Sequence, residues 1–155
     1  MLEGEVVLTH NNLTAPSEGS IHKIDIKQFP SLYKLHDGFM CKMRRCRNPH
    51  RYMLVDPSTC LSWQCPIRRA GSLYILLRIG RMSHATDPIH IDARLHDVTT
   101  DQTDEAYWRK RLDLTTLCPK ENTIYEINVG KISLTRAQHF IFKLELGDRV
   151  TGLVS

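Results

Sequence analysis

Hydrophobic and polar side chains alternate along three segments of the chain, residues 73–79, 89–96 and 140–146. A period of two residues is typical of β-strands with one buried face. The positions expected in the core are Leu73, Ile75, Leu77, Ile79, Ile89, Ile91, Ala93, Leu95, Phe140, Phe142, Leu144 and Leu146. These segments predict a mainly β protein.

Weaker patterns predict the remaining strands and loops. Residues 11–20 are rich in Asn, Thr, Pro, Ser and Gly, which predicts a loop after a short first strand. Residues 21–26 are expected to form the next strand. Near the end, residues 147–149 read as a turn and residues 150–154 as a returning strand.

One segment predicts a helix. Residues 101–104 offer N-cap candidates and acids, and residues 105–112 follow with Arg109, Lys110 and Arg111. Basic residues in the last turn of a helix complement its negative end. The helix would lie between the third and fourth strands.

Charge is unevenly distributed along the 155 residues, which fit a single domain spanning residues 1–155. The chain has a net charge of +4, yet residues 41–81 contain nine basic residues against one acid, Asp56, so the remainder is net negative. The basic residues are Lys42, Arg44, Arg45, Arg47, Arg51, Arg68, Arg69, Arg78 and Arg81. This segment forms either a face for a polyanion or an ordinary solvated surface.

Four cysteines form two pairs, each with four residues between its members: Cys41, Cys46, Cys60 and Cys65. Cys118 lies far from them, and the chain does not open with a secretory signal, so a reducing compartment is expected. There, paired cysteines usually bind metal, which predicts one structural zinc ion held by four thiolates. His50 could replace one of these ligands, and a disulfide framework is the alternative.

The two cysteine pairs and the residues between them are expected to form a hairpin, which we call the cysteine hairpin. It precedes the apolar strand at residues 73–79, and a Phe-Ile-Phe strand follows at residues 140–142. This order resembles the C-terminal DNA-binding domain of the large subunit of replication protein A. The same architecture occurs in a meiosis-specific relative, the large subunit of the telomeric CST complex, protection-of-telomeres proteins and a shieldin subunit. The resemblance implies a five-stranded OB-fold barrel with a zinc ribbon inserted at about residues 39–66. The second knuckle, residues 60–65, is longer than in that domain.

The resemblance also implies a function. An OB-fold groove binds single-stranded DNA by stacking bases on aromatic rings and by contacting phosphates with Lys and Arg. The candidate contacts are Arg44, Arg45, Arg47, Arg51, Tyr52, Arg78, Arg81 and His84. A nuclear domain of a multi-subunit genome- or telomere-maintenance complex is expected, with other protein subunits of that complex as partners. The alternative is a module that mainly binds a partner subunit.

Enzymatic motifs are not found in the sequence. It contains no glycine-rich phosphate loop, nucleophile elbow or two-histidine zinc helix. His90, Asp92 and His96 superficially resemble a hydrolase metal site, but strand alternation alone places them on one polar face. No apolar stretch approaches the roughly 20 residues of a membrane span. A non-catalytic domain without membrane contact is therefore predicted.

Overall fold

The computed structural model describes residues 2–24, 38–44, 59–81, 88–98 and 106–149. These residues form nine strands and one short helix. The strands are β1 (Leu2–His10), β2 (Ile21–Ile24), β3 (Gly38–Arg44), β4 (Thr59–Ile67), β5 (Gly71–Arg81), β6 (Pro88–Asp97), β7 (Trp108–Asp113), β8 (Ile124–Leu134) and β9 (Gln138–Arg149), and the helix is α1 (Leu114–Leu117). The prediction of a mainly β protein is confirmed.

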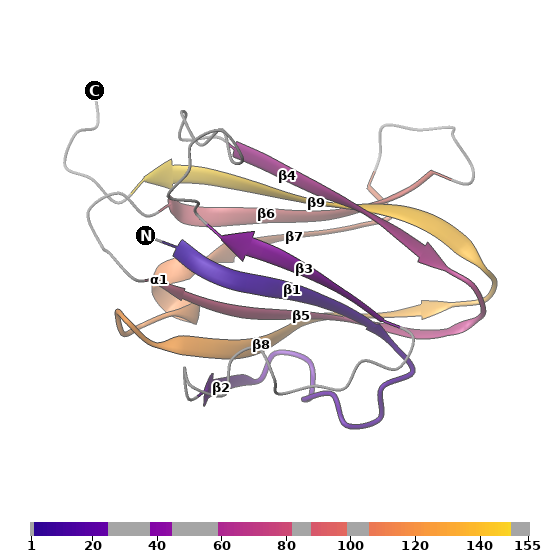
Figure 1. Cartoon of the computed structure of the whole chain (residues 1–155), viewed down its shortest axis with the longest axis horizontal. Coiled ribbons are helices and arrows are strands. Elements are labelled where there is room, and N and C mark those ends of the chain that lie inside the picture. The colour runs from indigo at the N-terminus through magenta and orange to yellow at the C-terminus, as the bar shows by residue number, and fades with distance from the viewer. Residues whose placement is uncertain (1, 25–37, 45–58, 82–87, 99–105, 150–155) are drawn as a thin grey trace.

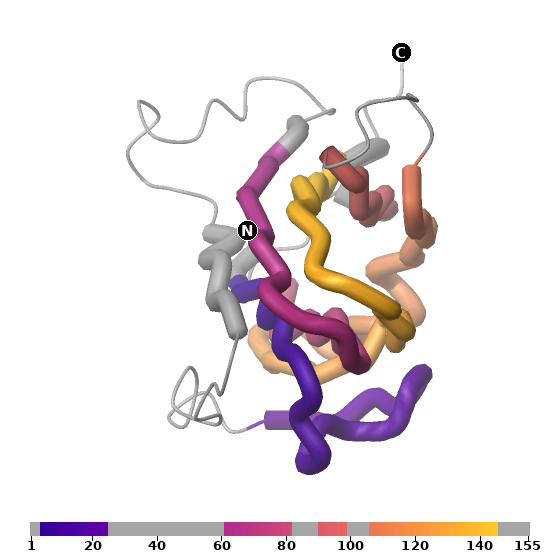
Figure 2. Tube along the Cα trace, turned by 90° about the vertical axis from the view of Figure 1, so that its right-hand side faces the viewer, coloured from indigo at the N-terminus to yellow at the C-terminus, as the bar shows by residue number. Residues whose placement is uncertain are grey.

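The strands form two antiparallel sheets that pack face to face (Figures 1 and 2). The first, called sheet A, has the order β2-β8-β5-β1-β3, and the second, sheet B, has the order β4-β9-β6-β7. From β3 to β6, successive strands alternate between the two sheets. Connections that cross between two sheets are typical of jelly-roll sandwiches.

The core lies between the sheets and draws apolar side chains from both. Leu73, Ile75, Leu77 and Ile79 of β5, Ile91, Ala93 and Leu95 of β6, and Phe140, Phe142 and Leu144 of β9 are all buried. The core positions predicted in these three strands are therefore confirmed, apart from Ile89 and Leu146, whose side chains lie outside the described residues. In β5 the opposite side is buried as well, at Leu76 and Arg78.

A closed five-stranded barrel does not form from the described strands, so the OB-fold prediction is corrected to a sandwich. A closed barrel has no edge strands, whereas here β2 and β3 border sheet A, and β4 and β7 border sheet B. The two strands expected to form the cysteine hairpin, β3 and β4, belong to different sheets. Each pairs with another strand, β3 with β1 and β4 with β9.

The helix predicted for residues 105–112 is also corrected. Residues 101–105 lie outside the described residues, and Trp108–Asp113 is β7, paired with β6. Trp108 packs over Gly130 of sheet A so closely that a Cβ atom there would lie 2.8 Å from the indole. Pairing with β6 and burial of Leu112 outweigh the weak local preference for helix. The described helix is the four-residue α1, which begins after β7.

The loop predicted for residues 11–20 is confirmed, and so is the strand after it, as far as Ile24. The turn predicted at residues 147–149 is wrong, because β9 continues to Arg149 beside β6. Residues 25–26 and 150–154 lie outside the described residues. None of the described residues belongs to a helix with the length and hydrophobicity of a membrane span.

Candidate nucleic-acid interface

Three of the four cysteines of the predicted zinc ribbon lie within β-strands. Cys41 lies in β3 of sheet A, Cys60 and Cys65 both lie in β4 of sheet B, and Cys46 lies outside the described residues. An extended strand rises about 3.3 Å per residue, so the Cα atoms of Cys60 and Cys65 are roughly 16 Å apart. Two thiolates on one zinc ion each lie only about 2.3 Å from the metal. Strand β4 therefore does not fit the predicted knuckle.

The surroundings of Cys65 also argue against a metal ligand. Its side chain is fully buried in the apolar core, where Cys65 pairs with Phe140 across β4 and β9. Within the described ranges, no group of three or more His, Cys, Asp or Glu side chains could hold a metal ion. One zinc ion per chain stays a prediction from the sequence, which elemental analysis of the purified protein tests.

Arg78, a predicted nucleic-acid contact, is instead a buried structural residue. Its side chain is 0% exposed, Nη1 lies 2.6 Å from Oε1 of Glu5, and Nε lies 3.1 Å from Oε2 of Glu126. The three residues are directly opposite one another on β1, β5 and β8. A ligand cannot reach Arg78 in this fold, because two carboxylates and the surrounding protein enclose it.

Arg81, a second predicted contact, is half-buried and holds the segment that follows α1. Its Nε and Nη2 donate to the carbonyl oxygen of Cys118 at 2.8 and 2.6 Å, and Nη2 also donates to that of Pro119 at 3.2 Å. These bonds engage much of the guanidinium with backbone groups. Arg81 therefore acts mainly in positioning this segment.

Arg44 and Arg81 lie at the same end of the sandwich. Arg44 is opposite Glu3, and Arg81 is opposite Leu2, so β3 and β5 end on either side of the start of β1. The remaining candidates, Arg45, Arg47, Arg51, Tyr52 and His84, lie outside the described residues, and their contact with nucleic acid stays a prediction.

The basic residues of segment 41–81 that the structure describes do not form one continuous surface. Arg68 and Arg69 are exposed in the turn between β4 and β5, whereas Arg81 lies at the far end of β5. β5 has 11 residues, so these groups are separated by roughly 35 Å. Buried Arg78 lies between them and does not bridge the gap.

A second concentration of charge lies on the outer face of sheet B. Strand alternation turns Asp92 and Arg94 of β6 outward while Ile91, Ala93 and Leu95 enter the core. Register places further charged residues on this face. The set is Asp92, Arg94, Arg109, Arg111, Lys143 and Glu145, which we call the sheet B face. Four of its six residues are basic, whereas exposed Lys110 alternates with Arg109 and Arg111 along β7 and lies on the other side of that edge strand.

The sheet B face consists of two rows that cross the strands. In one row, Arg109, Arg94 and Lys143 are directly opposite one another on β7, β6 and β9, and we call this the cation row. In the neighbouring row, Arg111, Asp92 and Glu145 occupy the same three strands. Three of the four cations of this face therefore share one line across the sheet, and Arg111 lies in the row that contains the two acids.

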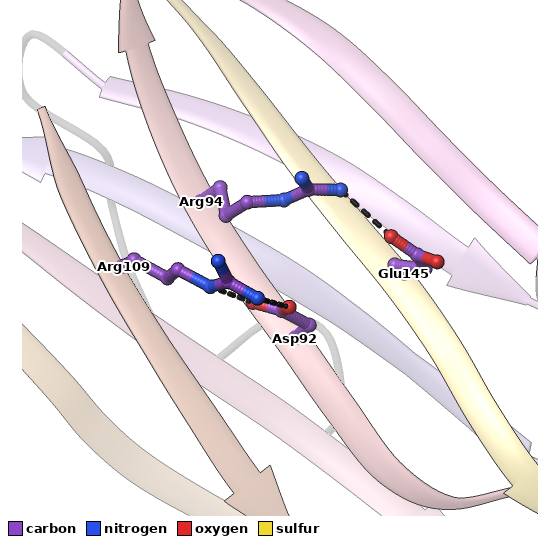
Figure 3. Close-up of polar contacts among 4 residues, drawn as sticks. All are labelled: Asp92, Arg94, Arg109 and Glu145. Carbon is purple, nitrogen blue, oxygen red and sulfur yellow. Dashed lines mark hydrogen bonds and ion pairs between the residues drawn. The ribbon is translucent and has the colours of Figure 1, made fainter. Parts of the chain in front are cut away.

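Two diagonal ion pairs join the rows (Figure 3). Arg94 Nη2 lies 2.7 Å from Oε2 of Glu145. Arg109 binds Asp92 in a bidentate manner, with Nη2 to Oδ2 at 2.6 Å and Nε to Oδ1 at 3.2 Å. This hydrogen bonding and the charge of Asp92 raise the pKa of the Arg109 guanidinium above its usual value. No salt bridge of Lys143 occurs in the described part of the chain.

Sequence reasoning missed the sheet B face. The sequence analysis assigned three consecutive cations to the last turn of a helix: Arg109, Lys110 and Arg111. Because all three are basic, they conceal the alternation of core-facing and outward-facing side chains along β7. The polar side of β6 was recognised from His90, Asp92 and His96, but its neighbours across the sheet depend on pairing that a single strand does not encode. Trp108 and Leu112, on the core side of β7, were the available signal.

Comparison with known proteins identifies no relative. No protein-family model, curated protein or solved structure matches the chain.

Proposed function

We propose that the chain is a non-catalytic domain that binds single-stranded DNA, with the sheet B face as its principal contact surface. The observation that carries this proposal is the cation row, in which three basic residues share one line across β7, β6 and β9. Exposed Lys and Arg supply most of the affinity of proteins for nucleic-acid backbones. The proposal does not need an OB-fold barrel, because an open sheet face also presents cations to an extended strand.

An exposed aromatic ring adjoins this surface in sequence. Tyr107 immediately precedes β7, is 46% exposed, and packs one side of its ring against Phe140 at a centroid distance of 5.2 Å. Bases stack on such rings with little sequence preference. Tyr107 supports binding of a single strand, whose bases are free to stack, over binding of a duplex.

The alternative function is a protein-interaction module that holds a partner subunit. The diagonal pairs of Arg94 with Glu145 and Arg109 with Asp92 favour it, because they neutralise part of the sheet B face. A surface with both signs of charge suits a partner protein with complementary charges. The nuclear setting and the genome- or telomere-maintenance complex remain predictions from the replication protein A resemblance.

The test compares two exposed basic residues on edge strands of opposite sheets. Arg109 belongs to the cation row on β7, and Lys23 lies on β2 at the edge of sheet A. Fluorescence anisotropy with a labelled oligothymidine, repeated over a range of salt concentrations, measures affinity and its salt dependence. Arg109→Glu should weaken binding about tenfold and flatten the salt slope, since each lost phosphate contact lowers that slope by about 0.7. Lys23→Glu should leave both unchanged.

Two results would count against the proposal. Absence of oligonucleotide binding by the wild type at low salt would reject it and favour the partner-binding alternative. Equal effects of the two substitutions would move the binding surface away from sheet B. Circular dichroism of each variant checks that the fold is retained.

A further inference from the structure

The cation row contains like charges that face each other directly. Arg94 is opposite Arg109 on one side and Lys143 on the other. Directly opposed like charges on one face of a sheet are destabilising. Protection of sheet edges does not explain this arrangement, because Arg94 and Lys143 lie on β6 and β9, the two central strands of sheet B.

The protein compensates this repulsion only in part. Glu145 binds one terminal nitrogen of Arg94, but the buried Nε of Arg94 has no hydrogen-bond partner among the described residues. Lys143 is half-buried and forms no ion pair there. Lys143 and the second terminal nitrogen of Arg94, on neighbouring strands, therefore keep unused capacity to donate hydrogen bonds to a ligand, whereas the buried Nε can only report on changes around this side chain.

A neutral donor continues the row. Ser62 of edge strand β4 is directly opposite Lys143, and its hydroxyl is exposed. The line from β6 across β9 to β4 therefore offers a guanidinium, an ammonium and a hydroxyl group, and it contains no carboxylate. An oxyanion with several acceptor oxygens is the group that satisfies such donors together.

We infer that Arg94, Lys143 and Ser62 form a binding site for the phosphate group of a single-stranded nucleic acid. This inference rests on the proposed function and adds a location and a direction to it. Asp92 and Glu145 occupy the next row, so a polyanion running parallel to the strands would meet their carboxylates. The nucleic acid therefore crosses the strands of sheet B along the cation row, toward Arg109 on β7.

The experiment measures oligothymidine affinity for three charge variants. Lys143→Glu should weaken binding about tenfold and reduce the salt slope. Lys131→Glu is the matched control, because Lys131 lies on central strand β8 of the other sheet and is exposed. It should change the affinity less than about twofold. Glu145→Gln should strengthen binding at least about twofold, because it removes a carboxylate that competes for Arg94.

A second measurement locates the anion directly. In a nuclear magnetic resonance titration, oligothymidine and, separately, inorganic phosphate should shift the side-chain Nε–H signal of Arg94. The residue-specific readout also distinguishes a nucleic-acid phosphate from free phosphate as the ligand.

The outcomes separate this inference from the proposed function. If the wild type binds oligothymidine but Lys143→Glu matches Lys131→Glu, the phosphate site is rejected and DNA binding stands. If oligothymidine does not bind while inorganic phosphate shifts Arg94, the proposed function fails and the anion site stands for another phosphate ligand. If neither ligand shifts Arg94, the site is overturned.

Discussion

Sheets A and B each contain a row of charged residues centred on an arginine of an inner strand, and the two rows have opposite designs. In sheet A, Arg78 lies between Glu126 and Glu5, so opposite charges are directly opposed. In sheet B, Arg94 lies between Lys143 and Arg109, so like charges are directly opposed. In the sheet A row, the arginine is paired with carboxylates directly opposite it. In the sheet B row, the residues directly opposite the arginine repel it.

Burial explains why sheet A requires internal compensation. Arg78 is 0% exposed, whereas the side chain of Arg94 is 25% exposed. A buried charge without a partner is strongly destabilising, so the sheet A row must be paired in the folded state. Solvent screens the sheet B row, which can tolerate unbalanced charge at a modest loss of stability. The comparison therefore separates a row that stabilises the fold from a row available to a ligand.

The largest expected effect comes from breaking the sheet A row. Arg78→Met leaves the carboxylates of Glu5 and Glu126 buried without their shared cation. Loss of one partner from a buried ion pair typically lowers the free energy of unfolding by about 3–5 kcal/mol. Urea denaturation followed by circular dichroism measures this change.

A compensating variant checks the cause. Adding Glu5→Gln and Glu126→Gln to Arg78→Met removes the uncompensated charges and should recover part of the lost stability. If Arg78→Met alone unfolds the protein, recovery of a cooperative transition in the triple variant still supports the explanation. A loss below about 1 kcal/mol for Arg78→Met would contradict the buried-triad interpretation.

The same type of substitution in sheet B should have the opposite sign. Lys143→Met removes one of two charges that repel Arg94 across the sheet. Relief of a directly opposed like-charge pair should raise the free energy of unfolding by about 0.2–1 kcal/mol. Urea denaturation of Lys143→Met beside Lys23→Met, an exposed lysine of sheet A, corrects for the general effect of replacing lysine by methionine. A loss of stability specific to Lys143→Met would show that Lys143 supports the fold.

A smaller effect is expected for the exposed ion pair of the sheet B face. The Arg109 side chain is 62% exposed, although its bond to Asp92 is bidentate. Exposed pairs of this kind typically contribute little to stability, and salt weakens them. Arg109→Ala should therefore lower the free energy of unfolding slightly, by less in high salt than in low salt. A loss that salt leaves unchanged would assign the effect to packing of the side chain.

The contrast between the rows also shows what a single sequence can predict. Alternation along β5, β6 and β9 identified the buried faces correctly, because that signal is local. Arg78 interrupts the apolar strand 73–79, and the sequence alone does not identify Glu5 and Glu126, 73 and 48 residues away, as its partners. The assignment of Arg78 to nucleic-acid contact failed for this reason.

The fold was predicted less well than its strands. Nothing local in residues 41–65 distinguishes a cysteine hairpin from two strands that join different sheets, because long-range pairing decides between them. Likewise, the spacing of Trp108 and Leu112 fits one face of a helix as well as the core side of β7. The cation row arises only from register, and it was therefore beyond single-strand reasoning.

The smallest expected effect concerns Asp113, an acid of sheet B that is satisfied locally. Its carboxylate caps α1 and accepts hydrogen bonds from the backbone N–H and the hydroxyl of Thr115 at 2.9 and 2.7 Å. These bonds lower the pKa of Asp113 below its usual value. A lowered folded-state pKa contributes stability above the unfolded pKa, and this contribution disappears as the pH falls through the folded pKa.

Asp113→Asn retains an acceptor at the cap but does not titrate, so it isolates the contribution of the charge. The difference in the free energy of unfolding between wild type and Asp113→Asn should be constant near neutral pH. This difference should shrink as the pH falls below the usual pKa of aspartate, about 3.9. Because hydrogen bonds to Thr115 are the main cause, added salt should change this profile little, in contrast to Arg109→Ala. A profile that flattens in salt would mean that cations of the sheet B face also stabilise the Asp113 carboxylate. The conclusion that this carboxylate is stabilised by its local hydrogen bonds alone would then be wrong.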